Sequence, residues 1–409
     1  MERNAPRYQA YVEILKEELI PAMGCTEPIA LAYAAAKARE VLGVLPDSVQ
    51  LQVSGSIIKN VKSVIVPNTG PLKGMEAAVA AGIIAGAAEK ELEVISEVSE
   101  EKKSAIRDYL QTVPITIEHT EQGHVFDIVV TERCGQDYAR VRIADYHTNI
   151  CRIEKNGTVL YEVPLLDETV QENARADRSL LNMQDIWDFA ETANLRDVAD
   201  LLERQIRYNN AIAEEGLLGD YGANIGRVLL TTYGNDVSNR AKAKAAAGSD
   251  ARMNGCELPV IINSGSGNQG ITCSVPLIEY AKELHSGKEK LYRALIISNL
   301  VAIHEKTGIG TLSAYCGAVS AGAGAGAGIV YLCGDGYQAA IHTVVNALAI
   351  VSGIVCDGAK ASCAAKIASS VDAALLGYNM YKCNQEFKGG DGIVMKDIET
   401  TIKGIGRLG

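Results

Sequence analysis

The hydrophobic pattern of this chain changes from a strand period to a helix period near residue 165. Upstream of that point apolar and polar residues alternate in five short segments, as β-strands require: residues 115–119, 125–131, 138–145, 149–154 and 158–163. Asn156-Gly157 separates the last two and predicts a tight hairpin, because both residues tolerate positive φ. Beyond Leu180 strand patterns nearly vanish and helical spacing takes over. The sequence therefore predicts an α+β fold, with a mixed or antiparallel sheet followed by a mainly helical domain.

The same pattern suggests where the domains begin and end. We expect an α+β lobe over residues 1–175 and a helical domain over residues 176–409, with the polar stretch 164–179 as a linker or crossover. Further predicted strands in the lobe cover residues 49–53 and 61–66. Predicted helices in the second domain cover residues 184–194, 197–216, 221–232, 236–248, 275–286, 289–304, 310–320, 336–352 and 360–379. The alternating Ala and Gly of residues 322–328 have apolar flanks, which indicates close backbone contacts.

Charge excludes some classes of partner. The 409 residues carry a formal net charge of −11 and no long run of Lys or Arg, which argues against nucleic acid and anionic membranes. The most apolar stretches, residues 77–88 and 339–356, are too short or too interrupted to span a bilayer. The first residues do not resemble a secretory signal, so the expected compartment is the cytoplasm.

Three of the ten cysteines are grouped in an apolar helical region. Cys316, Cys356 and Cys363 are separated by 40 and 7 residues and lie near Gly and Ala, with no His among them. Soft thiolates in a pocket with few polar groups are what an iron–sulfur centre needs. Three ligands would leave one iron of a cubane open, as Lewis-acid catalysis requires. We interpret six other cysteines as buried hydrophobic residues: Cys134, Cys151, Cys256, Cys273, Cys333 and Cys383.

Cys25 lies in a separate motif, Met23-Gly24-Cys25-Thr26-Glu27-Pro28, just before an Ala-rich helix. Thr26 suits the N-cap position and Pro28 suits the first turn. The partial positive charge of a helix N-terminus lowers the pKa of a thiol, so Cys25 is a candidate reactive cysteine. A buried cysteine in a tight turn is the alternative.

The glycine-rich segment 265–270 formally matches G-x-G-x-x-G. A dinucleotide site is disfavoured because helices follow where a βαβ unit would be needed. The segment also looks like the carboxylate loop of pyridoxal-phosphate enzymes, with Lys242 as the lysine, but the second half lacks the alternating strands of such folds. A turn rich in N–H and amide donors suits a small carboxylate in either case.

Four motifs together resemble one family. They are residues 23–28, residues 263–270, Tyr315-Cys316-Gly317, and Cys356-Asp357-Gly358-Ala359-Lys360 with Cys363. In this order they look like the L-cysteine desulfidase family, which is related to the catalytic α part of iron–sulfur L-serine dehydratases. The resemblance implies a 4Fe-4S cluster held by Cys316, Cys356 and Cys363, with Cys25 facing the open iron. Serine dehydratases have a longer gap between the last two ligands and a further domain or tail, which favours the desulfidase branch.

The resemblance implies a carbon–sulfur lyase acting on L-cysteine. Cys25 is the candidate base for the Cα proton, and the products would be pyruvate, ammonia and hydrogen sulfide. The predicted carboxylate and pocket residues are Ser264, Ser266, Asn268, Asn68 and Thr69. Further candidates for charge or proton transfer are Lys59, His304, Lys306, Lys360 and His147.

Two alternatives remain open at this point. The chain could act on L-serine as an ammonia-lyase on the same scaffold. It could instead be a non-catalytic iron–sulfur sensor or scaffold in which Cys25 is a permanent fourth ligand. The expected partner is a small amino acid, L-cysteine or L-serine, and a homodimer is the assembly considered.

Overall fold

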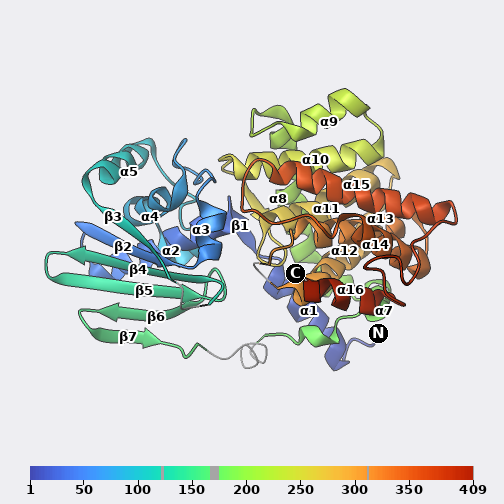
Figure 1. The fold of residues 1–409 in the computed structure, drawn as a ribbon, viewed down its shortest axis with the longest axis horizontal. Helices are drawn as coiled ribbons and strands as arrows, with labels where there is room; N and C mark the ends of the chain where they lie inside the picture. Colours follow the sequence, from blue (N-terminus) through green and yellow to red (C-terminus); the bar gives the residue numbers. More distant parts are fainter. Residues whose placement is uncertain (121–123, 166–174, 311–312, 409) are drawn as a thin grey trace.

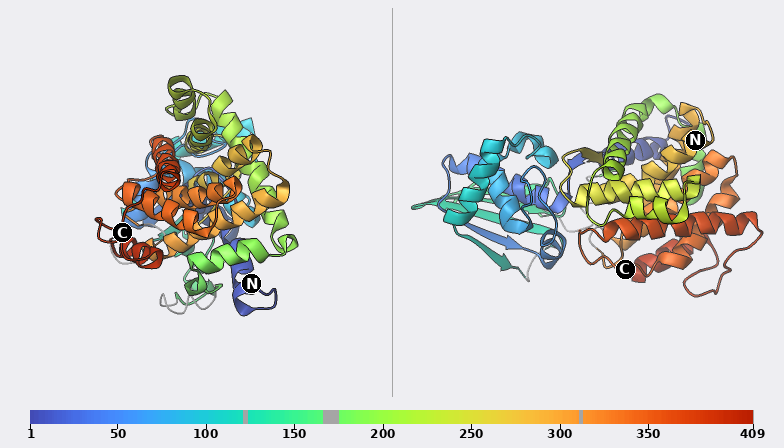
Figure 2. Two further views of the ribbon diagram at one scale, coloured as in Figure 1. Left: turned by 90° about the vertical axis from the view of Figure 1, so that its right-hand side faces the viewer. Right: turned by 90° about the horizontal axis from the view of Figure 1, so that it is seen from above.

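The computed structural model describes residues 1–120, 124–165, 175–310 and 313–408. A sheet part and a helical part lie side by side, and both chain ends are at the helical part (Figures 1 and 2). This architecture confirms the predicted α+β fold.

The sheet part contains six strands in the order β3-β2-β4-β5-β6-β7. They are β2 (Ser48–Val53), β3 (Ile115–His119), β4 (Asp127–Cys134), β5 (Asp137–Ala144), β6 (Ile150–Lys155) and β7 (Thr158–Glu162). β2 and β3 are parallel and the other neighbours are antiparallel. Helices α2 (Thr26–Leu42), α4 (Gly74–Ala85) and α5 (Glu100–Thr112) lie on one side of the sheet (Figure 1). The five strands predicted between residues 115 and 163 are confirmed.

The strand predicted over residues 61–66 is wrong. Helix α3 (Gly55–Val61) occupies the start of this region, and Ile65 makes only an isolated bridge with Lys73. Ile57 and Val61 are four residues apart and both fully buried, which is the spacing of one helix face. The helical spacing of these two residues therefore outweighs the β-branched composition of the run.

The helical part surrounds a central helix, α13. Its helices are α7 (Met183–Thr192), α8 (Ala199–Leu218), α9 (Ile225–Tyr233), α10 (Val237–Met253), α11 (Gly267–Glu283), α12 (Lys288–Ile309), α13 (Ala318–Cys333), α14 (Tyr337–Val351), α15 (Cys363–Lys382) and α16 (Ile398–Leu408). The helix predicted over residues 310–320 is wrong at residues 310 and 313–317, because α12 ends at Ile309 and α13 begins only at Ala318. Residues 311 and 312 lie outside the described residues.

The beginning of the chain packs against the helical part. Helix α1 (Pro6–Glu18) places Tyr8 and Tyr11 against the ring of Phe189, with ring centroids 5.1 and 5.3 Å apart. Strand β1 (Pro21–Met23) then pairs antiparallel with β8 (Pro259–Ile261). This pairing brings the Cys25 motif next to the loop that precedes α11. The division into residues 1–175 and 176–409 stays a prediction, although residues 6–23 lie with the second part in space.

Alternating Ala and Gly make α13 narrow enough to sit among four helices, α11, α12, α14 and α15. A Cβ on Gly322 would lie 2.8 Å from backbone and side-chain atoms of Ser370 in α15. A Cβ on Gly324 would meet the carbonyl oxygen of Ser298 in α12. The small residues thus permit close backbone contact, as the sequence predicts, but they do so within a helix.

A Gly324→Ala variant should therefore be destabilised by about 1–3 kcal/mol, because overpacking a close backbone contact outweighs the roughly 1 kcal/mol by which Ala favours a helix. Urea unfolding followed by circular dichroism measures this difference. Gly353→Ala is the control, since a Cβ at Gly353 has no neighbour within 4 Å. Equal unfolding midpoints for the two variants would contradict the packing argument.

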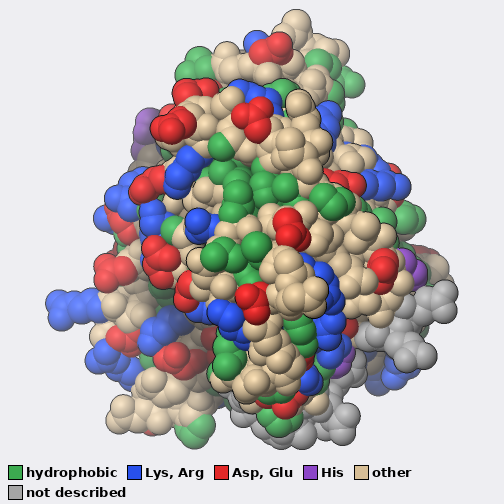
Figure 3. Space-filling view, turned by 90° about the vertical axis from the view of Figure 1, so that its left-hand side faces the viewer, with side chains coloured by type: hydrophobic (Ala, Val, Ile, Leu, Met, Phe, Trp, Pro, Cys, Tyr) green, Lys and Arg blue, Asp and Glu red, His purple; other side chains and the backbone are tan. Residues whose placement is uncertain are grey.

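The outer end of the sheet part shows Lys and Arg side chains interspersed with Asp and Glu (Figure 3). Among the described helices, none is long and apolar enough to cross a membrane. The absence of a nucleic-acid partner, the homodimer and the cytoplasmic compartment stay predictions.

Candidate functional site

Four cysteines from four segments line one cavity of about 100 Å³ between the helical part and helices α2 and α3 of the sheet part. Cys25 lies between β1 and α2, and Cys316 lies just before α13. Cys356 follows α14, and Cys363 is the first residue of α15. The structure thus brings together the four cysteines that the sequence singles out, although they span most of the chain.

A short antiparallel bridge holds Cys316 beside Cys356. Tyr315 and Val355 form the bridge. The backbone N–H of Cys316 donates to Ile354 O at 2.9 Å, and the N–H of Cys356 donates to Ala314 O at 2.7 Å. Main-chain hydrogen bonds therefore set the spacing of two thiols that are 40 residues apart in sequence.

Two lysines hold the loop that joins Cys356 to Cys363. Lys59 Nζ donates to Cys356 O at 3.3 Å, and Lys366 Nζ donates to Val355 O at 2.9 Å and pairs with Asp357. Gly358 has a φ of +100°, and a Cβ there would meet Lys59 O. Glycine is required at this position because a side chain would force the loop away from α3.

Cys25 forms a hydrogen-bonded group with Glu27. The Cys25 thiol donates to Glu27 Oε2 at 3.0 Å, and Asn60 Nδ2 donates to Glu27 Oε1 at 3.0 Å. Thr26 Oγ1 donates to Gly265 O at 3.0 Å, which ties this motif to the glycine-rich loop. The N-cap of α2 is Cys25 itself and Thr26 is the first helical residue, so the predicted cap is displaced by one position.

The expected low thiol pKa of Cys25 is not observed. Burial raises the pKa of Cys25 well above its ordinary value, and the negative charge of Glu27 adds to the effect. Desolvation and a neighbouring carboxylate outweigh the helix terminus. Burial acts to raise the pKa of Glu27 as well, but nearby His147 and the hydrogen bond from Cys25 bring that pKa below its usual value. In this pair Cys25 therefore keeps its proton, and the ionised Glu27 accepts the hydrogen bond.

Two buried cations face the same cavity. Lys306 is 6% exposed, and its Nζ donates to Ser313 Oγ at 3.3 Å. Burial lowers the pKa of Lys306 to about 8, while Cys356 and Cys316 oppose this shift. Arg252 is 2% exposed and donates from Nη1 to Asn268 Oδ1 at 3.1 Å. Neither cation takes part in an ion pair within 4.0 Å in the part of the chain that the structure describes.

The predicted substrate-binding residues divide into two groups. Ser266 and Asn268 line the cysteine cavity. Ser264 lines a larger neighbouring cavity of about 690 Å³ and donates to Asn263 Oδ1 at 2.9 Å. Asn68 donates to Ile95 O at 2.7 Å and Thr69 donates to Val66 O at 2.7 Å, and the structure does not bring these two side chains to the cysteine cavity.

The other polar candidates also separate in space. Lys59 lines the cysteine cavity, Lys306 lines both cavities, and His147 lines the larger one. The buried Nε2 of His147 has no hydrogen-bond partner in the part of the chain that the structure describes. His304 contacts Glu399 at 2.8 Å, and Lys360 pairs with Asp357 at 2.5 Å.

The structure does not support Lys242 as a pyridoxal-phosphate lysine. Its Nζ pairs with Asp372 at 2.5 Å, and Lys242 does not line the cavity beside Ser266 and Asn268. A Schiff-base lysine would have to reach the carboxylate loop.

Sequence reasoning missed Glu27, Asn60 and Arg252. Glu27 was inside a recognised motif, two residues from Cys25, so its proximity was available from the sequence. Arg252 gave a weaker signal, a single basic residue in the small-residue run Ala245–Met253. Asn60 gave none, because its partner Glu27 is 33 residues away.

The donor set fits an iron–sulfur cluster better than a single metal ion. No three of the described His, Cys, Asp and Glu side chains are grouped as one ion requires. The thiols of Cys316, Cys356 and Cys363 line a common cavity. An iron–sulfur cluster is larger than a single ion, so its cysteine ligands lie farther apart than the ligands of one metal ion. Lys306 supplies positive charge beside Cys316 and Cys356 that an anionic thiolate cluster would offset, since unpaired buried charges are costly.

Comparison with known proteins places these residues in a family. A model described as serine dehydratase alpha chain matches residues 89–409, which include Arg252, Cys316, Cys356 and Cys363. The UPF0597 protein DSY1109 of Desulfitobacterium hafniense (strain Y51) is 61% identical over 409 residues, covering 100% of this chain and 95% of the relative. A UPF0597 protein of Lachnoclostridium phytofermentans is 52% identical over 398 residues, covering 97% and 95%. One from Treponema denticola is 47% identical over 411 residues, covering 99% and 95%. The chain therefore belongs to the serine dehydratase alpha chain family.

Proposed function

We propose that this protein is a lyase that eliminates sulfide from L-cysteine, giving pyruvate, ammonia and hydrogen sulfide. The observation that carries the proposal is the convergence of Cys25, Cys316, Cys356 and Cys363 on one cavity. Membership of the serine dehydratase alpha chain family supports β-elimination from a small amino acid.

Cys316, Cys356 and Cys363 would hold a 4Fe-4S cluster. When bound, a cluster held by three thiolates presents one iron with an open position, which acts as a Lewis acid on the leaving sulfur. Backbone hydrogen bonds between the loops around Tyr315 and Val355 hold Cys316 and Cys356 side by side.

The chain's own residues supply the proton transfers. Transfer of the Cys25 proton to Glu27, to which the thiol is hydrogen-bonded at 3.0 Å, is uphill because the pKa of Cys25 is raised and that of Glu27 is lowered. The positive charge of Arg252 favours the thiolate and so reduces this cost. The resulting thiolate takes the Cα proton of L-cysteine, and the electrons of that C–H bond form the Cα–Cβ double bond as the Cβ–S bond breaks. Hydrosulfide leaves and takes the proton from Glu27 to become hydrogen sulfide, which regenerates the carboxylate. The aminoacrylate tautomerises to an imine that takes up water to give pyruvate and ammonia.

Side chains of the glycine-rich loop orient the substrate. Ser266 and Asn268 lie on the cavity wall as donors for its polar groups. Ser264 faces the larger cavity, and Asn68 and Thr69 are bonded to backbone elsewhere, so their part in binding stays a prediction.

Dehydration of L-serine is the second candidate function, and the family description favours it. L-Serine has the same carbon skeleton with a hydroxyl as the leaving group. Hydroxide is a poorer leaving group than sulfide, so the same site should act on L-serine more slowly.

Anaerobic reconstitution with iron and sulfide followed by assays on both amino acids tests the proposal. We expect equal amounts of sulfide and pyruvate from L-cysteine, and a higher kcat/KM than for pyruvate formation from L-serine. A higher kcat/KM for L-serine would identify a dehydratase. A full complement of cluster with turnover of neither amino acid would support the sensor, with Cys25 as a fourth ligand.

A further inference from the structure

Arg252, in the last turn of α10, is a buried cation that makes no ion pair within 4.0 Å with a described residue; the carboxylate of Glu27 acts on it only from across the cavity. It is 2% exposed and lines the cysteine cavity. Arginine has five N–H donors, but among the described residues Arg252 makes a single hydrogen bond, from Nη1 to Asn268 Oδ1. Its buried Nε has no hydrogen-bond partner within that part of the chain. A buried guanidinium with unused donors is costly unless an anion completes it.

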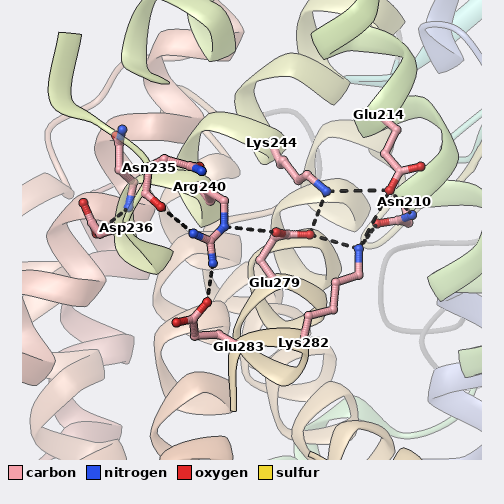
Figure 4. Close-up of polar contacts among 10 residues, drawn as sticks. Asn210, Glu214, Asn235, Asp236, Arg240, Lys244, Glu279, Lys282 and Glu283 are labelled. Carbon is pink, nitrogen blue, oxygen red and sulfur yellow. Dashed lines mark hydrogen bonds and ion pairs between the residues drawn. The ribbon is translucent and has the colours of Figure 1, made fainter. Parts of the chain in front are cut away.

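Two other cations on α10, Arg240 and Lys244, do form ion pairs with carboxylates, in contrast to Arg252. Arg240 pairs with Glu283 and with Glu279, and Lys244 pairs with Glu279 at 2.8 Å (Figure 4). These contacts join the first half of α10 to the last turns of α11. Arg252 lies at the other end of α10, near the start of α11, and no carboxylate among the described residues forms an ion pair with it.

The first turn of α11 faces the guanidinium and favours an anion as well. Ser266 is the N-cap of this 17-residue helix, its side chain makes no capping hydrogen bond, and the first turn contains no acidic residue. The first N–H groups of a helix have no partner within it and carry partial positive charge. A Cβ on Gly267 would lie 2.7 Å from Arg252 Cζ, so glycine lets the loop backbone lie directly against the guanidinium.

The space between Arg252 and the first turn of α11 suits a small, planar anion. The cavity of about 100 Å³ admits a small molecule, and a guanidinium fork matches a carboxylate with two parallel hydrogen bonds. Ser266 and Asn268 add neutral donors on the same wall. Glu27 also lines the cavity, where it serves the acid–base step of the proposed mechanism.

We infer that Arg252 and the first turn of α11 bind the α-carboxylate of the substrate and so restrict the site to amino acids whose carboxylate is free. This inference rests on the proposed function, since the missing anion is the substrate's own carboxylate. It predicts that L-cysteinamide and cysteamine, which carry the thiol but no carboxylate, are poor substrates.

Arg252→Gln and Arg252→Lys test the inference, with Arg240→Gln as the matched control on the same helix. Binding of L-alanine, which has no leaving group, is measured by calorimetry on anaerobically reconstituted protein, and iron and acid-labile sulfide are measured on the same samples. Arg252→Gln should weaken L-alanine binding roughly 100-fold, as removal of one partner of a buried charged pair does. Arg252→Lys should restore part of it, because a point charge replaces the fork. Arg240→Gln should bind as the parent does.

Turnover gives a second readout. The parent should prefer L-cysteine to L-cysteinamide, and Arg252→Gln should lose most of this preference while its iron content is unchanged. Undiminished L-alanine binding by Arg252→Gln would overturn the inference. If that variant instead lost its iron while still binding L-alanine, Arg252 would serve the cluster and the inference would be wrong. If the parent bound L-alanine through Arg252 but released no sulfide from L-cysteine, the proposed function would fail and the carboxylate site would stand.

Discussion

A Cys356→Ala variant, reconstituted anaerobically, is expected to retain little iron and to turn over L-cysteine at least about 1,000-fold more slowly than the parent, because losing a Lewis acid removes several kcal/mol of transition-state stabilisation. Cys356 contributes one of three thiols to the cavity, and its neighbour Cys316 is fixed by the Tyr315–Val355 bridge. Two thiols alone cannot complete the proposed ligand set. Iron analysis, acid-labile sulfide and visible absorption measure the loss.

Cys333→Ala is the control for this experiment. Cys333 ends α13, is exposed and does not line the cavity. It should keep its iron and its activity. Circular dichroism should show the same helix content in both variants, because the bridge that holds residue 356 is made by backbone atoms. Normal cluster content in Cys356→Ala would remove Cys356 from the ligand set.

Replacing Glu27 with glutamine should lower kcat for L-cysteine by roughly 10²- to 10⁴-fold, the usual effect of losing an acid–base group. The amide keeps the size of the side chain and can still contact Asn60, but it cannot take the proton of Cys25. KM and iron content should change little, since Glu27 holds no cluster. Steady-state kinetics on reconstituted protein measure the effect.

A double variant makes this test sharper. If Cys25 and Glu27 act as one unit, Cys25→Ala combined with Glu27→Gln should be no slower than the slower single variant, because effects within a unit are not additive. Glu40→Gln lies on the same helix, is exposed and pairs with Lys37, so it should be neutral. Additive losses would show that Cys25 and Glu27 act in separate steps.

Local patterns in the sequence account for much of the fold. The Asn156-Gly157 hairpin forms with φ of 48° and 81° at the two residues, because a tight turn depends on just these positions. α13 shows where local patterns are insufficient. Nearly every residue in its first ten is Ala, Gly or Ser, so no apolar stripe marks its start, and the prediction placed a helix over residues 310–320 instead.

The residue type alone identified Cys316, Cys356 and Cys363 as candidate metal ligands, because clustered thiols in a reducing environment suggest a metal centre. Their convergence, the ionisation of Cys25 and the significance of Arg252 required the three-dimensional structure. A thiol pKa depends on burial and on a carboxylate that points at it, and whether a guanidinium has an ion-pair partner depends on its neighbours in space. The sequence by itself thus identified the four cysteines, whereas long-range packing revealed Glu27, Asn60 and Arg252 and determined the charge and partner of each group.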